Sequence, residues 1–145
     1  MSGLVLKLGP RERIMINGVV MENGDRRTRI NIVTPEANVL RLRDAIHPED
    51  AKTPVKRVCY VAQLVLAGEA DPTEARKQLL SGIEQLSQVF LDEDSRKFLS
   101  DATDAVVEGR FYQAMRALRG LIPRETRLLA VGADGESASG GAASA

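Results

Sequence analysis

Residues 4–46 read LVLKLGPRERIMINGVVMENGDRRTRINIVTPEANVLRLRDAI, with apolar and polar residues alternating along most of the segment. Alternation places one set of side chains in a core and the other on the opposite face of each strand. Asn17-Gly18 and Asn23-Gly24 favour type I′ hairpin turns, because such turns need positive φ at both central residues. The segment therefore predicts a small antiparallel β-sheet or half-barrel. The expected inward sets are Leu4, Leu6 and Leu8; Ile14 and Ile16; Thr28, Ile30 and Ile32; and Leu40 and Leu42.

Arginine occupies the outward positions of the last two expected strands. Arg27 and Arg29 alternate with the apolar set of one strand, and Arg41 and Arg43 alternate with that of the next. Residues 1–46 contain eight basic and five acidic residues, a net charge of +3, so the remainder of this neutral chain has a net charge of −3. A guanidinium group can stack on bases and bind phosphate or guanine edges through two hydrogen bonds. The pattern alone leaves two readings open, a solvated sheet face and a nucleic-acid surface.

Aromatic side chains are missing from the expected strands. Residues 4–46 contain no Phe or Tyr, and the whole chain contains no Trp. A base-stacking sheet of the RRM or OB kind is therefore excluded on these strands. Nucleic-acid binding by this segment would have to rely on arginine and lysine.

Helix signals start after a connection interrupted by Pro48 and Pro54, since proline does not continue a helix. Asp71-Pro72-Thr73-Glu74 supplies a capping carboxylate, proline in the first turn and glutamate near the positive end of the helix dipole. Asp92 opens a further helix in the same way. The expected helices run over residues 55–67, closed by Gly68; from Pro72, with Leu79, Ile83, Leu86 and Phe90 on one face; from Asp92 to Gly109; and from Arg110, with a stop or kink at Pro123 and one or two more turns to Val131.

The chain divides into three expected parts. Residues 1–47 form a β-strand segment of RNA-binding type, and residues 48–131 form a helical segment of about four helices. Residues 132–145 are rich in glycine and other small residues, which cannot bury enough apolar area to offset chain entropy, so we expect a disordered tail. The predicted fold class is α+β.

Catalytic chemistry is poorly represented in the sequence. The single histidine, His47, precedes a proline in a connection, and the single cysteine, Cys59, lies within an apolar helical run. A buried structural thiol is a better reading of Cys59 than a nucleophile, which needs a basic and partly exposed setting. Glycine-rich phosphate loops, dinucleotide fingerprints and metal-ligand spacings are all absent from the sequence. We therefore expect no enzymatic activity, no cofactor and no metal.

The sequence predicts a cytoplasmic protein without a membrane partner. No run of about 18 apolar residues is present, as a membrane-spanning helix would need. The N-terminus, MSGLVLKLGP, lacks the basic region and long apolar segment of a signal peptide. A lone cysteine also fits a reducing compartment, because it cannot form an internal disulfide.

Four motifs occur together along residues 4–129. They are L-x-L-x-P-x-E at Leu6–Glu12, I-N-G at Ile16–Gly18, the basic strand Arg26–Ile30, and Gly109-Arg110-Phe111-Tyr112 with Ala114. Their combination resembles the FlbT family, the flagellin post-transcriptional repressors of alphaproteobacteria. This resemblance implies a regulator of flagellum assembly. Such proteins associate with the 5′ untranslated region of flagellin mRNA and lower its translation and lifetime until the hook is built.

The strand segment opens with L-x-L, continues with a glutamate before an apolar pair, and ends in Leu42-Arg43-Asp44-Ala45-Ile46. These features are distantly similar to CsrA, a small RNA-binding translational regulator. That similarity implies a strand-exchanged homodimer which binds GGA-containing RNA along its first and last strands, with Arg43 at the RNA. The first strand departs from the CsrA pattern, since Lys7-Leu8-Gly9 stands where CsrA has adjacent arginines. Lys7 and Arg11 are the candidate substitutes.

These observations predict a repressor that binds the 5′ untranslated region of flagellin mRNA and blocks translation or promotes degradation. A protein-interaction module or chaperone is the alternative, binding flagellin or the regulator FlaF through the helical half. There, Phe98, Phe111, Tyr112 and Met115 offer a partner surface or simply fill the core. The CsrA similarity leaves a homodimer open. The predicted RNA-binding residues are Lys7, Arg11, Arg27, Arg29, Arg41 and Arg43.

Overall fold

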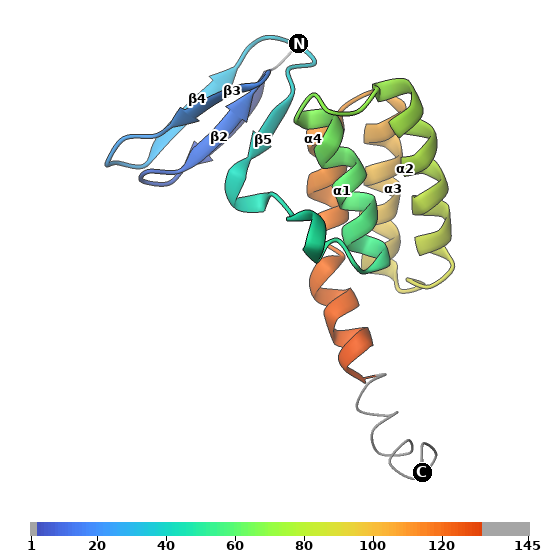
Figure 1. Cartoon of the computed structure of the whole chain (residues 1–145). Coiled ribbons are helices and arrows are strands. Elements are labelled where there is room, and N and C mark those ends of the chain that lie inside the picture. Colours follow the sequence, from blue (N-terminus) through green and yellow to red (C-terminus); the bar gives the residue numbers. More distant parts are fainter. Residues whose placement is uncertain (1–2, 132–145) are drawn as a thin grey trace.

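The computed structural model describes residues 3–131, in which antiparallel strands precede a layer of helices (Figure 1). The predicted α+β class is confirmed. The strands are β1 (Leu4–Leu8), β2 (Arg13–Ile16), β3 (Val19–Glu22), β4 (Thr28–Ile32) and β5 (Val39–Arg41). The helices are the 3-10 turns η1 (Leu42–Asp44) and η2 (Pro48–Asp50), then α1 (Pro54–Leu66), α2 (Pro72–Ser87), α3 (Glu93–Val107) and α4 (Phe111–Arg119), followed by helical residues 122–131. The tail predicted over residues 132–145 lies outside the described residues.

The strands form two small antiparallel sheets. In one sheet β1 pairs with β4, and in the other β2 lies between β3 and β5. The hairpin predicted at Asn17-Gly18 is confirmed, because these residues have φ of 49° and 84° and directly connect β2 to β3. Buried Leu6, Leu8 and Ile14 lie in one apolar cluster that joins the two sheets.

The second hairpin, predicted at Asn23-Gly24, is wrong. Neither residue has positive φ, and β4 pairs with β1 instead of with its sequence neighbour β3. The Asn23 side chain explains the difference, because its amide donates to the carbonyl oxygens of Gly9 at 2.7 Å and of Arg26 at 2.9 Å. These two bonds hold the chain beside the end of β1, so that β4 starts next to the strand it pairs with.

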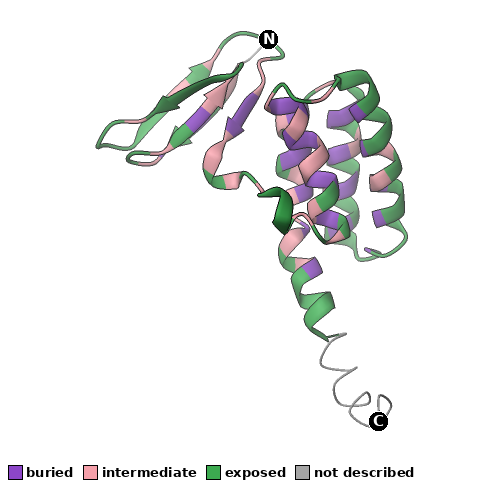
Figure 2. Cartoon of the chain, in the orientation of Figure 1, coloured by how far each residue is buried: buried purple, intermediate pink, exposed green. Residues whose placement is uncertain are grey.

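Strand β5 is buried on both faces, contrary to the predicted alternation. Val39 is 0% exposed and packs in the cluster between the sheets, whereas Leu40 is 4% exposed and packs in the helical core. The strand also ends earlier than predicted, because the chain turns into η1 at Leu42 and places Arg43 on that turn. β5 thus contributes to both apolar clusters. Figure 2 shows this strand coloured largely as buried, next to the helices.

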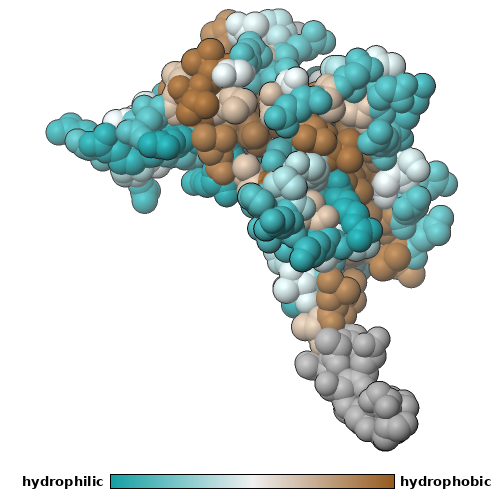
Figure 3. Space-filling view, in the orientation of Figure 1, coloured by the Kyte–Doolittle hydropathy of each residue, from teal (hydrophilic) through white to brown (hydrophobic). Residues whose placement is uncertain are grey.

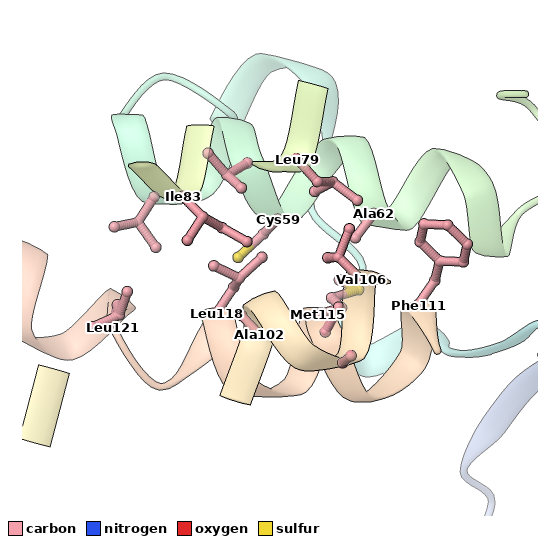
Figure 4. Packing of buried hydrophobic residues seen from close by; sticks show 14 of the residues in the cluster. Cys59, Ala62, Leu79, Ile83, Ala102, Val106, Phe111, Met115, Leu118 and Leu121 are labelled. Atoms are coloured by element: carbon pink, nitrogen blue, oxygen red, sulfur yellow. The ribbon is translucent and has the colours of Figure 1, made fainter. Parts of the chain in front are cut away.

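The helices follow the predicted signals closely. The side chains of Asp71 and Asp92 accept hydrogen bonds from the backbone N–H groups of Glu74 and Ser95, at 3.2 and 3.0 Å, and so cap α2 and α3. α1 is the helix with the most buried face, and its Cys59 faces Leu118 of α4 across the core (Figure 4). Burial raises the pKa of the Cys59 thiol to about 12, which agrees with the predicted structural role.

Pro123 does not end the last predicted helix. Helix α4 stops at Arg119, and Gly120 lies against the ring of Phe98, where an added Cβ would be 2.6 Å from a ring carbon. Pro123 lies in the first turn of the following helix, where the missing N–H has no partner to lose. Met115, proposed from the sequence as a partner surface or as core, is 3% exposed and belongs to the core, as does Phe111 at 7%.

The helical residues 122–131 project away from the four-helix layer (Figure 1). Glu125 anchors their beginning, since its buried carboxylate accepts hydrogen bonds from the Thr53 hydroxyl and, at 2.8 Å, from the Val55 N–H. Beyond this anchor Leu128 and Leu129 are about half exposed, at 51% and 52%. Over residues 3–131, the helices are too short or too polar to cross a lipid bilayer.

The two-sided burial of β5 generates a first prediction. Leu40→Ala removes apolar atoms from the helical core and should lower the free energy of unfolding by about 3 kcal/mol. Val33→Ala is the control, since Val33 is 74% exposed and its truncation should change stability by less than about 0.5 kcal/mol. Urea unfolding followed by circular dichroism measures both values, and equal stability of the two variants would contradict the assignment of Leu40 to the core.

Candidate nucleic-acid interface

A shallow groove with four cationic side chains crosses the end of the β1–β4 sheet. Its lining includes Lys7 of β1, Arg29 of β4, Arg27 just before β4, and Arg43 of η1. We call this set the basic groove. Hydrophilic side chains cover the end of the sheets that lies away from the helices, as Figure 3 shows for one face of the molecule. The structure therefore places four of the six predicted RNA-binding residues around one feature, although they come from three separate elements.

Lys7 and Arg29 lie directly opposite each other across the β1–β4 ladder. Both side chains are exposed, and along residues 3–131 neither forms an ion pair with a carboxylate. Like charges in directly opposed cross-strand positions destabilise a sheet. An anion bound between them would remove that repulsion, so this pair is the strongest local indication of a phosphate contact.

Arg43 links the basic groove to the interior of the molecule. Its side chain is 59% exposed, and its Nε lies 3.5 Å from Oε2 of Glu12, a long contact that leaves most of the guanidinium open to solvent. The same residue also lines a second, neighbouring cavity. Arg43 therefore lies at the border between the two cavities.

Arg41, also predicted to contact RNA, is held inside the protein. Its Nε and Nη2 donate to Oε2 and Oε1 of Glu12 at 2.6 and 2.7 Å, and Nη2 also donates to the Lys7 carbonyl oxygen at 2.7 Å. The two side chains are only 11% and 6% exposed. The hydrogen bond from Arg41, helped by the N–H of Gly9, lowers the pKa of Glu12 to about 2. This arrangement suits a residue that fixes the position of β1 against β5.

Arg11 lies outside the basic groove. It has a positive φ of 60° and forms ion pairs with Asp25 at 2.7 Å and Glu22 at 3.4 Å. Glu22 also binds Arg13 at 2.9 Å. Acidic neighbours therefore offset the charge of Arg11, and the structure does not bring it together with the other predicted residues.

A cavity of about 470 Å³ lies where the strands meet α4, and we call it the junction cavity. Lys7 and Arg43 line both the basic groove and the junction cavity, so the two features adjoin. The remaining lining residues are Val5, Leu6, Val39, Leu40, Arg41, Asp44, Leu66, Tyr112, Met115, Arg116 and Arg119.

Tyr112, Arg116 and Arg119 also line the junction cavity. The sequence reasoning missed the two arginines and considered Tyr112 only as a protein-partner surface or a core residue. They are far from the strands in sequence, but α4 packs against α1 and its exposed side reaches the junction cavity. Their spacing of four and then three residues puts them on one face of α4, and this signal was readable in the sequence. The guanidinium of Arg119 is already engaged within the protein, because it donates to the Asp44 carbonyl oxygen at 3.0 Å and pairs with the Asp44 carboxylate at 3.5 Å.

Comparison with known proteins gives a consistent result. Residues 4–129 match the family model described as "Flagellar protein FlbT". The chain is 34% identical over 127 residues to the "Probable flagellum biosynthesis repressor protein FlbT" of Rhodopseudomonas palustris strain TIE-1, covering 87% of this chain and 97% of the relative. The protein of the same name from Allorhizobium ampelinum is 31% identical, with 88% and 85% of the two chains covered. No solved structure matches the chain.

The pair formed by Glu12 and Arg41 generates a stability prediction. Glu12→Ala leaves a nearly buried guanidinium without its carboxylate and should lower the free energy of unfolding by about 3 kcal/mol. Glu22→Ala breaks exposed ion pairs to Arg13 and Arg11, which solvent screens, and should cost much less stability than Glu12→Ala. Urea unfolding at pH 7 measures both, and a smaller loss for Glu12→Ala than for Glu22→Ala would contradict the structural role of Glu12.

The lowered pKa of Glu12 generates a pH prediction. A carboxyl whose pKa is lower in the folded state stabilises the protein above its unfolded pKa, which is near 4.5, and this contribution is lost as the pH falls toward the folded value of about 2. The wild type should therefore lose stability more steeply than Glu12→Gln between pH 5 and pH 2. Parallel slopes in unfolding experiments across that range would contradict the pKa assignment.

Proposed function

The chain belongs to the FlbT family, and from this premise we propose that it represses flagellin synthesis after transcription by binding the 5′ untranslated region of flagellin mRNA through the basic groove. The names of its relatives support the coarser role, repression of flagellum biosynthesis. The proposed action is binding without catalysis, in the cytoplasm, where flagellin mRNA is translated. The bound 5′ untranslated region, here called the leader RNA, is then unavailable to ribosomes or is exposed to a nuclease.

The opposed pair of Lys7 and Arg29 is the observation that best supports RNA as the ligand. A fold maintains two like charges face to face at an energetic cost, which a bound polyanion offsets. The phosphate backbone supplies negative charges at regular spacing, and lysine and arginine bind it without reading sequence. Arg27 and Arg43 extend the cationic surface on either side of this pair, so the basic groove can contact several successive phosphates.

The limited acidity near the basic groove supports the same proposal. Within residues 3–131, the only carboxylate that reaches the lining cations in an ion pair is Glu12, at 3.5 Å from Arg43, and it is mainly engaged by Arg41. Two further acidic residues of the strand segment, Glu22 and Asp25, pair with Arg11 and Arg13 outside the groove. The local charge at the groove is therefore positive although the whole chain is neutral.

A flagellar protein partner is the second candidate, with flagellin and FlaF as the proteins to test. The observation in its favour is the projecting helix of residues 122–131, on which Leu128, Leu129 and Val131 are more than half exposed. Exposed apolar side chains on a helix suit a protein surface better than RNA. The two functions use different surfaces and are compatible, and a second copy of this chain is another occupant of the same helix.

The proposed RNA contact generates a binding prediction. Lys7→Ala/Arg29→Ala should weaken binding of the flagellin leader RNA and flatten the dependence of log K on log salt by about 1.4, which corresponds to two lost contacts on a single strand. The same variant should be no less stable than the wild type, because it removes a like-charge pair. Fluorescence anisotropy at several salt concentrations measures the slope, and thermal unfolding measures the stability.

The matched control is Arg76→Ala/Lys77→Ala. It removes the same charge from α2, which packs on α1 and α3 and not on the strands. We expect its salt slope to equal that of the wild type. If both double variants weaken RNA binding equally, binding depends on net charge and not on the basic groove. If the wild type does not bind the leader RNA but does bind flagellin or FlaF, the protein-partner function replaces the RNA-binding function.

A further inference from the structure

Tyr112 is the one aromatic side chain that lines the junction cavity. It is the second residue of α4, it is half-buried, and it packs against both apolar clusters. The sequence of the strand segment excludes aromatic stacking on the strands themselves. The fold nevertheless supplies a stacking ring at their border from the start of a helix more than 60 residues later.

Tyr112 lies beside the ion pair of Arg41 and Glu12, since Tyr112 and Arg41 line the same cavity. The hydrogen bonds that Arg41 donates to Glu12 raise the pKa of Arg41, and Tyr112 adds to this effect. Arg41 is in turn bound to the Lys7 carbonyl oxygen at 2.7 Å. The packing of Tyr112 against both apolar clusters restricts its ring, so binding there orders few additional side chains.

The remaining walls of the junction cavity combine apolar and cationic groups. Leu40, Leu66 and Met115 are almost fully buried and supply an apolar base, and Arg43 and Arg116 are exposed cations at the edge. A volume of about 470 Å³ is within the range of pockets that bind small organic groups. A phosphate alone leaves apolar walls of this kind unfilled, whereas a base presents both a flat apolar face and polar edges.

We propose that the junction cavity binds one unstacked nucleobase of a single-stranded RNA whose backbone follows the basic groove, with the base against Tyr112. The proposal rests on the RNA-binding function proposed above. Lys7 and Arg43 line both features and would contact the phosphates on either side of the inserted base. Arg116, which has no ion-pair partner between residues 3 and 131, is placed to donate hydrogen bonds to the edge of the base.

This geometry selects single-stranded RNA over a duplex. A paired base cannot leave its helix without loss of pairing and stacking, whereas bases in loops and single strands are already free to do so. Stacking on an aromatic ring is tolerant of base identity, because every base has a π-face. The cavity therefore predicts a preference for unpaired segments of the leader, with sequence preference depending on the hydrogen bonds from Arg116.

The test uses two ligands, the flagellin leader RNA and long-chain inorganic polyphosphate, which has the charge but no bases. Tyr112→Leu should weaken RNA binding about ten-fold, the scale of one lost stacked base, and leave polyphosphate binding unchanged. Tyr112→Phe retains the ring and should restore RNA affinity to within about two-fold of the wild type. Lys7→Ala/Arg29→Ala should weaken binding of both ligands.

Tyrosine fluorescence tests the proposal without replacing Tyr112, and therefore applies even if Tyr112→Leu fails to fold. The chain has two tyrosines and no tryptophan, so Tyr60→Phe makes Tyr112 the sole source of tyrosine emission. Stacking of a base on its ring should quench that emission when RNA is added, and polyphosphate should not quench it.

The outcomes separate this proposal from the function on which it rests. RNA binding that depends on Lys7 and Arg29 but neither weakens in Tyr112→Leu nor quenches Tyr112 would overturn the base pocket and leave the basic groove intact. An equal loss of RNA and polyphosphate binding in Tyr112→Leu would also overturn it. Absence of RNA binding by the wild type would overturn both proposals.

Discussion

The bidentate pair between Glu12 and Arg41 determines how the strands meet. Glu12 lies in the turn after β1, and its carboxylate also accepts a hydrogen bond from the Gly9 N–H at 3.0 Å. Arg41 at the end of β5 reaches the Lys7 carbonyl oxygen, so one ion pair joins the first strand, its turn and the last strand. The position of Lys7 in the basic groove depends on this connection. A nearly buried charge pair with all its contacts satisfied imposes one geometry, because each partner is costly to leave alone.

Local signals in the sequence predicted most of the fold. The capping carboxylates Asp71 and Asp92 and the Asn17-Gly18 turn act over a few residues, and the structure has each of them as expected. The errors arose where distant residues compete with a local preference. Asn23 bonds to Gly9, 14 residues earlier, and this long-range contact replaces the second hairpin turn. Sequence periodicity does not predict such long-range contacts.

The candidate site was also predicted only as far as local signals allow. Alternation on β1 and β4 correctly placed Lys7 and Arg29 on an exposed face. It gave no means of separating the exposed Arg29 from Arg41, which is nearly buried against Glu12, since both alternate with apolar residues. The helical contribution was missed for a different reason. The part of the chain after residue 46 has a net charge of −3, which directed attention to the strands, whereas Arg116 lies on a face of α4 that lines the junction cavity. The net charge of a segment does not show which of its charged side chains the fold places at the site.

The shared strand β5 has a consequence for synthesis on the ribosome. The N-terminal strands emerge first, but Met15 and Leu40 pack against the core built from α1 to α4, which is translated later. A nascent chain that ends before α4 has the cations of the basic groove but lacks the ring of Tyr112 and the apolar base of the junction cavity. The complete surface is assembled only when the last of these helices leaves the exit tunnel. A product truncated before α4 would therefore lack the proposed base pocket.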